Sequence, residues 1–414
     1  MEYQEPSTVK DSHDSASPEL RIQNVGRVLA AAIRAVADAI PGTPHGPVEV
    51  ARRLGIDKVL ASRVLKAVKN RDPVAALHDA PGPEPLRRFI RAAQKRGVSA
   101  DLAEDANQAV RSFEDLIRQE AGDRSAFDVI LSAWLPEARS AFELRRKQAA
   151  FRAIGQLKGV EGNLLSATAI LHPSTDGEHL DVVWLFGLLG LKRLRPGSPV
   201  KFASRRLVPE NGVRLPRTLT GETVGGLDGL RLDQFCSTPL PEMQIHPVGE
   251  VVHYTLADNG YGLRSACDLV FAEVNLSEMP RYIPAEQQRK RHVFAEISVP
   301  VKLLLFDALV HRNVFLGHDP NLAIYDTACE GVADPNDPSR DIDRLDTSET
   351  IQNLGWGVDK FRSSDEPRYA DILRHVWDSL GWDTGDFRGY RCRIDYPLYG
   401  SQVVITWPSD PPPP

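Results

Sequence analysis

Residues 48–66 read VEVARRLGIDKVLASRVLK, and this stretch decides how the first part of the chain folds. Its spacing predicts two short helices joined by a tight turn. Gly55 can adopt the positive φ that a three-residue turn requires, and Ala51 is small enough to let the second helix cross the first closely. Asp57 stands where a carboxylate can cap the second helix. We therefore predict a helix-turn-helix between residues 47 and 69.

The apolar residues of this stretch define its inner side. Leu54 and Ile56 flank the turn and are expected to enter the core. In the second helix Val64 faces inward, together with Leu60 or Ala61. This arrangement leaves an outer face that is mostly cationic and consists of Lys58, Ser62, Arg63, Lys66 and Lys69.

Basic residues are concentrated around the same stretch. The whole chain has a formal net charge of −6. Residues 47–100 nevertheless hold twelve Lys or Arg and five Asp or Glu, which gives this segment +7 and the rest of the chain −13. A basic segment on an acidic chain is typical of a polyanion-binding module attached to another domain.

The stretch resembles the helix-turn-helix of bacterial transcription regulators, and the lac-repressor type is the most similar. Val50-Ala51, Gly55-Ile56 and residues 62–65 (SRVL) carry the resemblance, which covers only residues 47–69. It implies that the helix from Asp57 to Lys69 is a recognition helix lying in the major groove of double-stranded DNA.

The resemblance also implies which residues meet the DNA. Lys58, Ser62 and Arg63 would approach bases or phosphates from the recognition helix, which begins at Asp57. The remaining members of the predicted site would meet the phosphate backbone, and they are Arg52, Arg53, Lys66 and Lys69.

Other features depart from that family. A long helix is expected before the motif, and no alternation of strands and helices follows it. Ala61 is smaller than the branched residue usual at its position. The corner can therefore also be read as a packing unit of a helical domain, with its basic helix merely solvated. Arg87, Arg88, Arg91, Lys95 and Arg96 either extend a phosphate-binding surface or keep a helix soluble.

Alanine content divides the chain. Residues 21–160 contain 26 Ala, whereas residues 161–414 contain 13. Alanine favours helices because it loses no side-chain entropy on ordering. We predict a multidomain α plus β protein, in which an all-α helix-turn-helix domain precedes a mostly β, mixed α+β part. The expected boundaries are a disordered tail at 1–20, the helical domain at 21–160, the β-rich part at 161–408, which can form two subdomains, and a tail at 409–414.

Periodicity predicts the elements beyond the motif. Helical spacing is expected over residues 19–40, 85–96, 99–121, 125–157 with a break at Pro136, and 366–380. Alternating or β-branched runs predict strands over residues 165–171, 182–189, 200–204, 249–256, 269–274, 292–305, 390–396 and 402–407.

The sequence shows no catalytic motif. It contains no P-loop, no G-x-S-x-G and no H-E-x-x-H. Its histidines are dispersed, and a metal site at His311 and His318 is a minor alternative to surface histidines. We therefore expect neither an enzyme nor a cofactor or metal site. Four scattered cysteines and a polar N-terminus favour the cytoplasm, and the longest apolar run, residues 182–191, is too short to span a membrane.

These features lead to three hypotheses. The first is a DNA-binding transcriptional regulator with a C-terminal module that senses an unknown effector or oligomerises. A homodimer is part of this reading, because one helix-turn-helix contacts only a few base pairs. The second is an interaction or scaffold protein in which the helix-turn-helix is structural only. The third and weakest is an enzyme of unrecognised type in residues 161–408.

Overall fold

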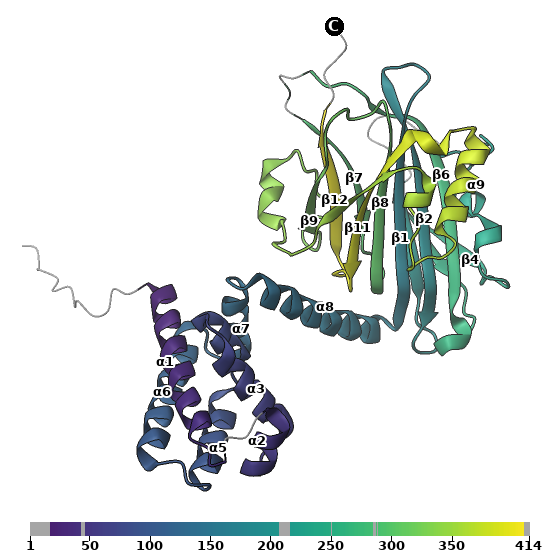
Figure 1. Cartoon of the computed structure of the whole chain (residues 1–414). Coiled ribbons are helices and arrows are strands. Elements are labelled where there is room, and N and C mark those ends of the chain that lie inside the picture. Colours follow the sequence, from purple (N-terminus) through teal and green to yellow (C-terminus); the bar gives the residue numbers. More distant parts are fainter. Residues whose placement is uncertain are drawn as a thin grey trace, which may run out of the picture. The chain divides into compact units, whose positions relative to one another are not determined.

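The protein forms two compact units, residues 1–142 and residues 143–414. The structure is a computed structural model, and it describes residues 17–42, 46–206, 216–249, 251–284, 287 and 289–409 (Figure 1). An N-terminal helical unit is followed by a β-rich unit, so the predicted multidomain α plus β fold class is confirmed.

Unit one is helical throughout its described residues. Its helices are α1 (Pro18–Asp38), α2 (Pro47–Leu54), α3 (Lys58–Lys69), α4 (Pro73–Asp79), α5 (Pro83–Gln94), α6 (Ala100–Glu120) and α7 (Arg124–Ser132).

The first helix begins inside the range expected for the N-terminal tail. Residues 18–20 form the first turn of α1, because Ser17 caps the helix by accepting a hydrogen bond from the Leu20 amide and Pro18 is preorganised for a first helical position. The expected tail at residues 1–16 lies outside the described residues.

The helices share one apolar core. Ile33 of α1, Val64 of α3 and Leu77 of α4 are each at most 2% exposed, and Phe89 and Phe113 are completely buried. Helix α1 packs along α4 and α6, and α3 packs against α2 and α4. The core therefore fixes the position of α3 from its inner side.

Helix α8 (Pro136–Lys158) crosses the division between the units. Its later turns belong to the β-rich unit: Glu143 accepts hydrogen bonds from the amide and hydroxyl of Ser348, Lys147 pairs with Glu349, and the rings of Phe151 and Tyr396 lie 5.4 Å apart. For this reason the boundary falls at 142/143, inside a helix, and not at the expected 160/161.

Three sheets make up the β-rich unit. The largest has the strand order β10-β11-β8-β1-β2-β6, in which β1 and β8 run parallel and the other neighbours are antiparallel. Its strands are β1 (Val160–Pro173), β2 (His179–Arg193), β6 (Cys267–Pro280), β8 (Val301–His311), β10 (Ile351–Trp356) and β11 (Phe387–Asp395). Two three-stranded sheets, β7-β12-β9 and β3-β5-β4, contain β3 (Val200–Arg206), β4 (Met243–Val248), β5 (Val251–Leu256), β7 (Lys290–Glu296), β9 (Asn321–Asp326) and β12 (Ser401–Pro408).

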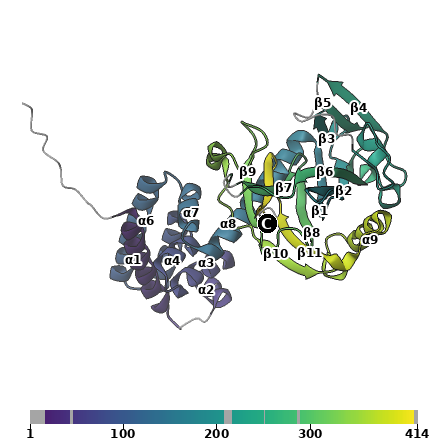
Figure 2. The ribbon, with the colours of Figure 1, turned by 90° about the horizontal axis from the view of Figure 1, so that it is seen from above.

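The six-stranded sheet is covered on both faces. One face packs against the two smaller sheets through residues such as Phe306, Val403 and Trp407. The other face packs against α9 (Tyr369–Leu380), whose Leu373 and Trp377 are completely buried. Figure 2 shows α9 and the β7-β12-β9 sheet on opposite sides of the large sheet.

One predicted strand was wrong, and three strands were missed. The expected single strand at 292–305 is two strands, because the chain leaves one sheet after β7 and enters another at β8, with Pro300 between them. Strands β4, β9 and β10 were not predicted; they are short and partly exposed, so their alternation is weak.

Of the expected C-terminal tail, Ser409 donates a hydrogen bond to the Arg289 carbonyl, and residues 410–414 lie outside the described residues.

Candidate nucleic-acid interface

Helices α2 and α3 form the predicted corner, with residues 55–57 as the turn. Gly55 has a φ of +67°, in the left-handed region that favours glycine. The Asp57 carboxylate accepts hydrogen bonds from the amides of Val59 and Leu60 at 2.7 and 3.2 Å, which caps α3. The local geometry predicted from the sequence is confirmed, and the helical corner below means α2, this turn and α3.

The inner side of the helical corner is apolar as predicted. Ala51 and Leu54 of α2 are 8% and 6% exposed. In α3, Val64 is completely buried, and both of the alternatives for its companion, Leu60 and Ala61, are buried as well. Leu60 and Ala61 are adjacent in the sequence, and both can be buried because α3 packs against α1 and α4 as well as α2.

The outer side carries every other member of the predicted site. Lys58, Ser62, Lys66 and Lys69 are exposed and follow one another three or four residues apart, so they form one row along α3. Arg63 lies beside this row, and Arg52 and Arg53 are exposed on α2. Asp57 is also exposed, but its carboxylate is engaged in capping the helix.

Two cations of α3 bind the end of α4. Arg63 donates to the Ala80 carbonyl at 2.9 Å, and Lys66 pairs with Asp79 at 2.8 Å. Asn70 donates to the second carboxylate oxygen of Asp79 at 2.7 Å. Burial acts to raise the pKa of Asp79, but the hydrogen bonds from Lys66 and Asn70 outweigh it and hold the pKa below its usual value. Arg63 and Lys66 therefore help to fix α3 in the domain.

Two further arginines, which the sequence did not point to, complete these contacts. Arg34 of α1 donates to the Val68 carbonyl at 3.0 Å, near the end of α3. Arg124 of α7 donates to the carbonyls of Leu77 and His78 in α4, and burial lowers its pKa. Cations are favourable at helix C-termini, where carbonyls have no partner in the helix. In the sequence, both arginines stand within helical patterns, but these patterns do not indicate which carbonyl groups they bind.

The remaining cations of the basic segment divide into two groups. On α5, Arg91 pairs with Glu84 at 2.7 Å, and Arg87 pairs with Glu84 and with Glu114 of α6. The other basic side chains of the segment are exposed, and for them the described part of the chain contains no ion pair: Arg52, Arg53, Lys58, Lys69, Arg71, Arg88, Lys95 and Arg96.

The residues that follow α1 lie close to the ends of both α2 and α5. A Cβ atom placed on Gly42 would lie 1.8 Å from the guanidinium of Arg53, so Arg53 lies directly over this glycine. A Cβ atom on Gly97, which follows α5, would lie 3.6 Å from the ring of Pro41. Exposed Lys95 and Arg96 therefore belong to the same neighbourhood as the cations of α2.

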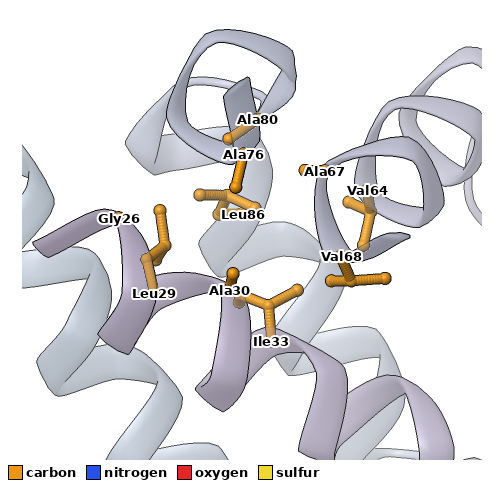
Figure 3. A pocket seen from close by; sticks show the side chains of 10 residues that line it. All are labelled: Gly26, Leu29, Ala30, Ile33, Val64, Ala67, Val68, Ala76, Ala80 and Leu86. Carbon is orange, nitrogen blue, oxygen red and sulfur yellow. The ribbon is translucent and has the colours of Figure 1, made fainter. Parts of the chain in front are cut away.

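Behind α3 lies a small cavity lined by side chains of α1, α3, α4 and α5 (Figure 3). Its volume is about 10 Å³, the room of one water molecule, and its lining is apolar. Gly26 lines this space. A larger residue would not fit there, because its Cβ atom would come within 2.3 Å of the Pro73 carbonyl oxygen. The cavity results from close helix packing and is too small for an organic ligand.

The histidines of the β-rich unit include His311, which the sequence offered as a minor candidate for a metal ligand. No group of three or more His, Cys, Asp or Glu that could hold a metal occurs among the described residues. The His311 ring instead lies 4.7 Å from that of His172, which stacks on Trp382. Burial lowers the pKa of both histidines. No helix in the described ranges is both long and apolar enough to span a membrane.

Comparisons with known proteins add little. No protein-family model matches the sequence, and no curated protein matches it. A solved structure from Parabacteroides distasonis, described as a "putative protease", is similar over 60% of this chain, with 8% identity and a TM-score of 0.25. This chain spans 40% of that protein's length. A likeness this low carries no argument about function.

Proposed function

We propose that the protein is a DNA-binding transcriptional regulator in which α3 enters the major groove of duplex DNA. The observation that carries the proposal is the exposed row of Lys58, Ser62, Lys66 and Lys69 on a helix held by a glycine turn and an aspartate cap. The major groove is wide enough to admit an α-helix. The local charge of +7 in an acidic chain supports the same reading.

In this proposal the cations have different roles. Lys58 and Ser62 lie in the first half of α3, the part of a recognition helix that approaches base edges. Lys69, with Arg52 and Arg53, suits phosphates, and the long side chain of Lys58 can reach a phosphate as well. Arg63 and Lys66 bind the end of α4. Substituting either of them would therefore change the stability of the domain as well as its affinity for DNA.

The β-rich unit would sense an effector or assemble the regulator into a dimer. A dimer places two recognition helices on two half-sites, which doubles a small interface. Light scattering of the full chain with and without duplex DNA tests this part, and a monomer in both states would remove the dimer from the proposal.

Titration of full-length protein into labelled genomic duplex DNA tests the DNA-binding proposal. Lys58→Glu with Lys69→Glu is the informative double variant, because neither lysine contacts another described element through an ion pair. We expect its affinity to fall at least about tenfold. Arg111→Glu with Arg118→Glu on α6 is the matched control, since it changes the net charge equally and should preserve affinity to within about threefold.

The scaffold alternative is favoured by one specific observation, the use of Arg63 and Lys66 inside the domain. It predicts no retardation of any duplex at low salt and recovery of an acidic protein partner. Equal duplex affinity for the wild type and the Lys58/Lys69 variant would also remove α3 from the DNA interface.

A further inference from the structure

A polar cavity opens at one edge of the six-stranded sheet, in the β-rich unit. Its volume is about 310 Å³, within the range of small-molecule sites. Strand β10 and the residue before it contribute Thr350 and Gln352, strand β11 contributes Arg391, and the segment after η6 (Val358–Lys360) contributes Arg362, Ser363 and Ser364.

The cavity is the open end of a polar row that crosses four strands. Gln352 of β10 lies opposite Arg391 of β11, Arg391 lies opposite Asp307 of β8, and Asp307 lies opposite Thr168 of β1. Cross-strand partners share a face of the sheet. This is the face that α9 covers, and Tyr369 of α9 bonds both Asp307 and Thr168 at 2.8 and 2.7 Å. We refer to Gln352, Arg391, Asp307 and Thr168 as the polar row.

Arg391 is held rigidly at the junction of the buried row and the cavity. Its Nε and Nη2 atoms bind the two carboxylate oxygens of Asp307 at 2.9 and 2.7 Å. Nη2 also donates to the Phe361 carbonyl, and Nη1 donates to the Arg362 carbonyl at 2.9 Å. A guanidinium has five N–H donors. Within the described residues, one hydrogen on Nη1 lacks a protein acceptor, and the exposed tenth of the side chain lines the cavity.

The rest of the lining supplies donors in excess of acceptors. Asp365 is the lining carboxylate, and both of its oxygens are bound by Arg393 at 2.9 and 3.3 Å. Arg362 pairs directly with Asp359 at 3.0 Å, and the two side chains are 67% and 76% exposed. Such an exposed pair exchanges readily with another anion.

We propose that this cavity binds a small anion with a carboxylate or phosphate group, held by Arg362 and Arg391 and by the hydroxyls of Ser363 and Ser364. Guanidinium groups bind both kinds of oxyanion through directed, charge-assisted hydrogen bonds. Since Asp307 already balances the charge of Arg391, Arg362 supplies the charge and Arg391 supplies a fixed donor. Binding at this cavity does not require DNA, so it stands or falls separately from the proposed DNA interface.

Calorimetric titration and thermal unfolding of the full chain without DNA test the proposal, with sodium phosphate and sodium malonate as the probes and sodium chloride at matched ionic strength as the reference. We expect at least one probe to bind saturably and to raise the melting temperature above the chloride reference. Phosphate alone would indicate a phosphate ligand, and malonate alone a carboxylate ligand.

Three variants locate the binding. Arg362→Gln should weaken it about tenfold while leaving the fold intact, because the side chain is exposed. Ser363→Ala with Ser364→Ala should weaken it as well. Arg374→Gln, a half-buried arginine that also pairs with Asp359 but does not line the cavity, is the control and should bind normally. Absence of saturable binding by both probes, or equal binding by wild type and Arg362→Gln, would overturn the proposal.

Discussion

The helical corner and the polar row both depend on arginine and lysine side chains, but they use them in different ways. In the row, Arg391 is 9% exposed and is neutralised by a carboxylate that is completely buried. In the corner, the cations stay at the surface, and those with partners bind helix ends or a single aspartate. Arg391 and Asp307 each depend on the other, whereas the helical corner retains cations that have no ion pair in the described ranges and can meet another molecule.

The largest expected effect is in the polar row. Replacing Asp307 with Ala leaves Arg391 buried without its counter-charge, which typically costs about 3–5 kcal/mol of unfolding free energy. Chemical denaturation followed by tryptophan fluorescence measures the loss, because Trp377 of α9 is buried in the core on this face of the sheet. A loss below about 1 kcal/mol would show that Arg391 reaches solvent without Asp307. The arginine of the polar row would then resemble the surface cations of the helical corner.

A second effect concerns the packing behind the helical corner. Gly26→Val places a side chain against the Pro73 carbonyl, which a Cβ atom alone would approach within 2.3 Å. Overpacking of this kind costs about 1–3 kcal/mol. Hydrogen exchange of the full-length variant measures this loss of stability. Amide protection should fall in α1 and α4 and should stay unchanged in the β-rich unit. Unchanged protection in these helices would contradict the close approach.

A third comparison separates the two kinds of cation within α3. Arg63→Ala removes the donor to the Ala80 carbonyl and should reduce the unfolding free energy by about 1 kcal/mol. Lys58→Ala should change it by less than about 0.5 kcal/mol, because an exposed side chain with no ion pair to any residue that the structure describes stabilises little. Equal losses in urea denaturation would remove the distinction between structural and free cations.

The smallest effect is a pH dependence at Asp79. Its pKa in the folded protein lies below the ordinary value of 3.8, so its stabilising contribution is present above that value and is lost as the pH falls through the folded-state pKa. The wild type should exceed Asp79→Asn in stability at pH 6, and the difference should shrink below about pH 4. Urea denaturation across this range checks the sign, and a difference that grows on acidification would contradict it.

The sequence predicted what depends on neighbours in the chain. Gly55, Asp57 and the apolar spacing around Val64 define the helical corner locally, and the structure agrees. Contacts between distant segments were missed. Arg63 binds the carbonyl of Ala80, which lies beyond α4 in the sequence. Arg391 binds Asp307, 84 residues away, only because the strand register places the two residues opposite each other. Neither pairing leaves a periodic pattern, so the polar row could not be read from the sequence.

The salt dependence of duplex binding tests the central claim most directly. If Arg52, Arg53, Lys58 and Lys69 meet phosphates, the logarithm of the binding constant of the full chain should fall linearly with the logarithm of salt concentration, with a slope of about −3 to −4. Lys58→Glu with Lys69→Glu should make that slope shallower by about 2. A chain that does not bind duplex DNA at low salt, or a variant with the wild-type slope, would contradict the account.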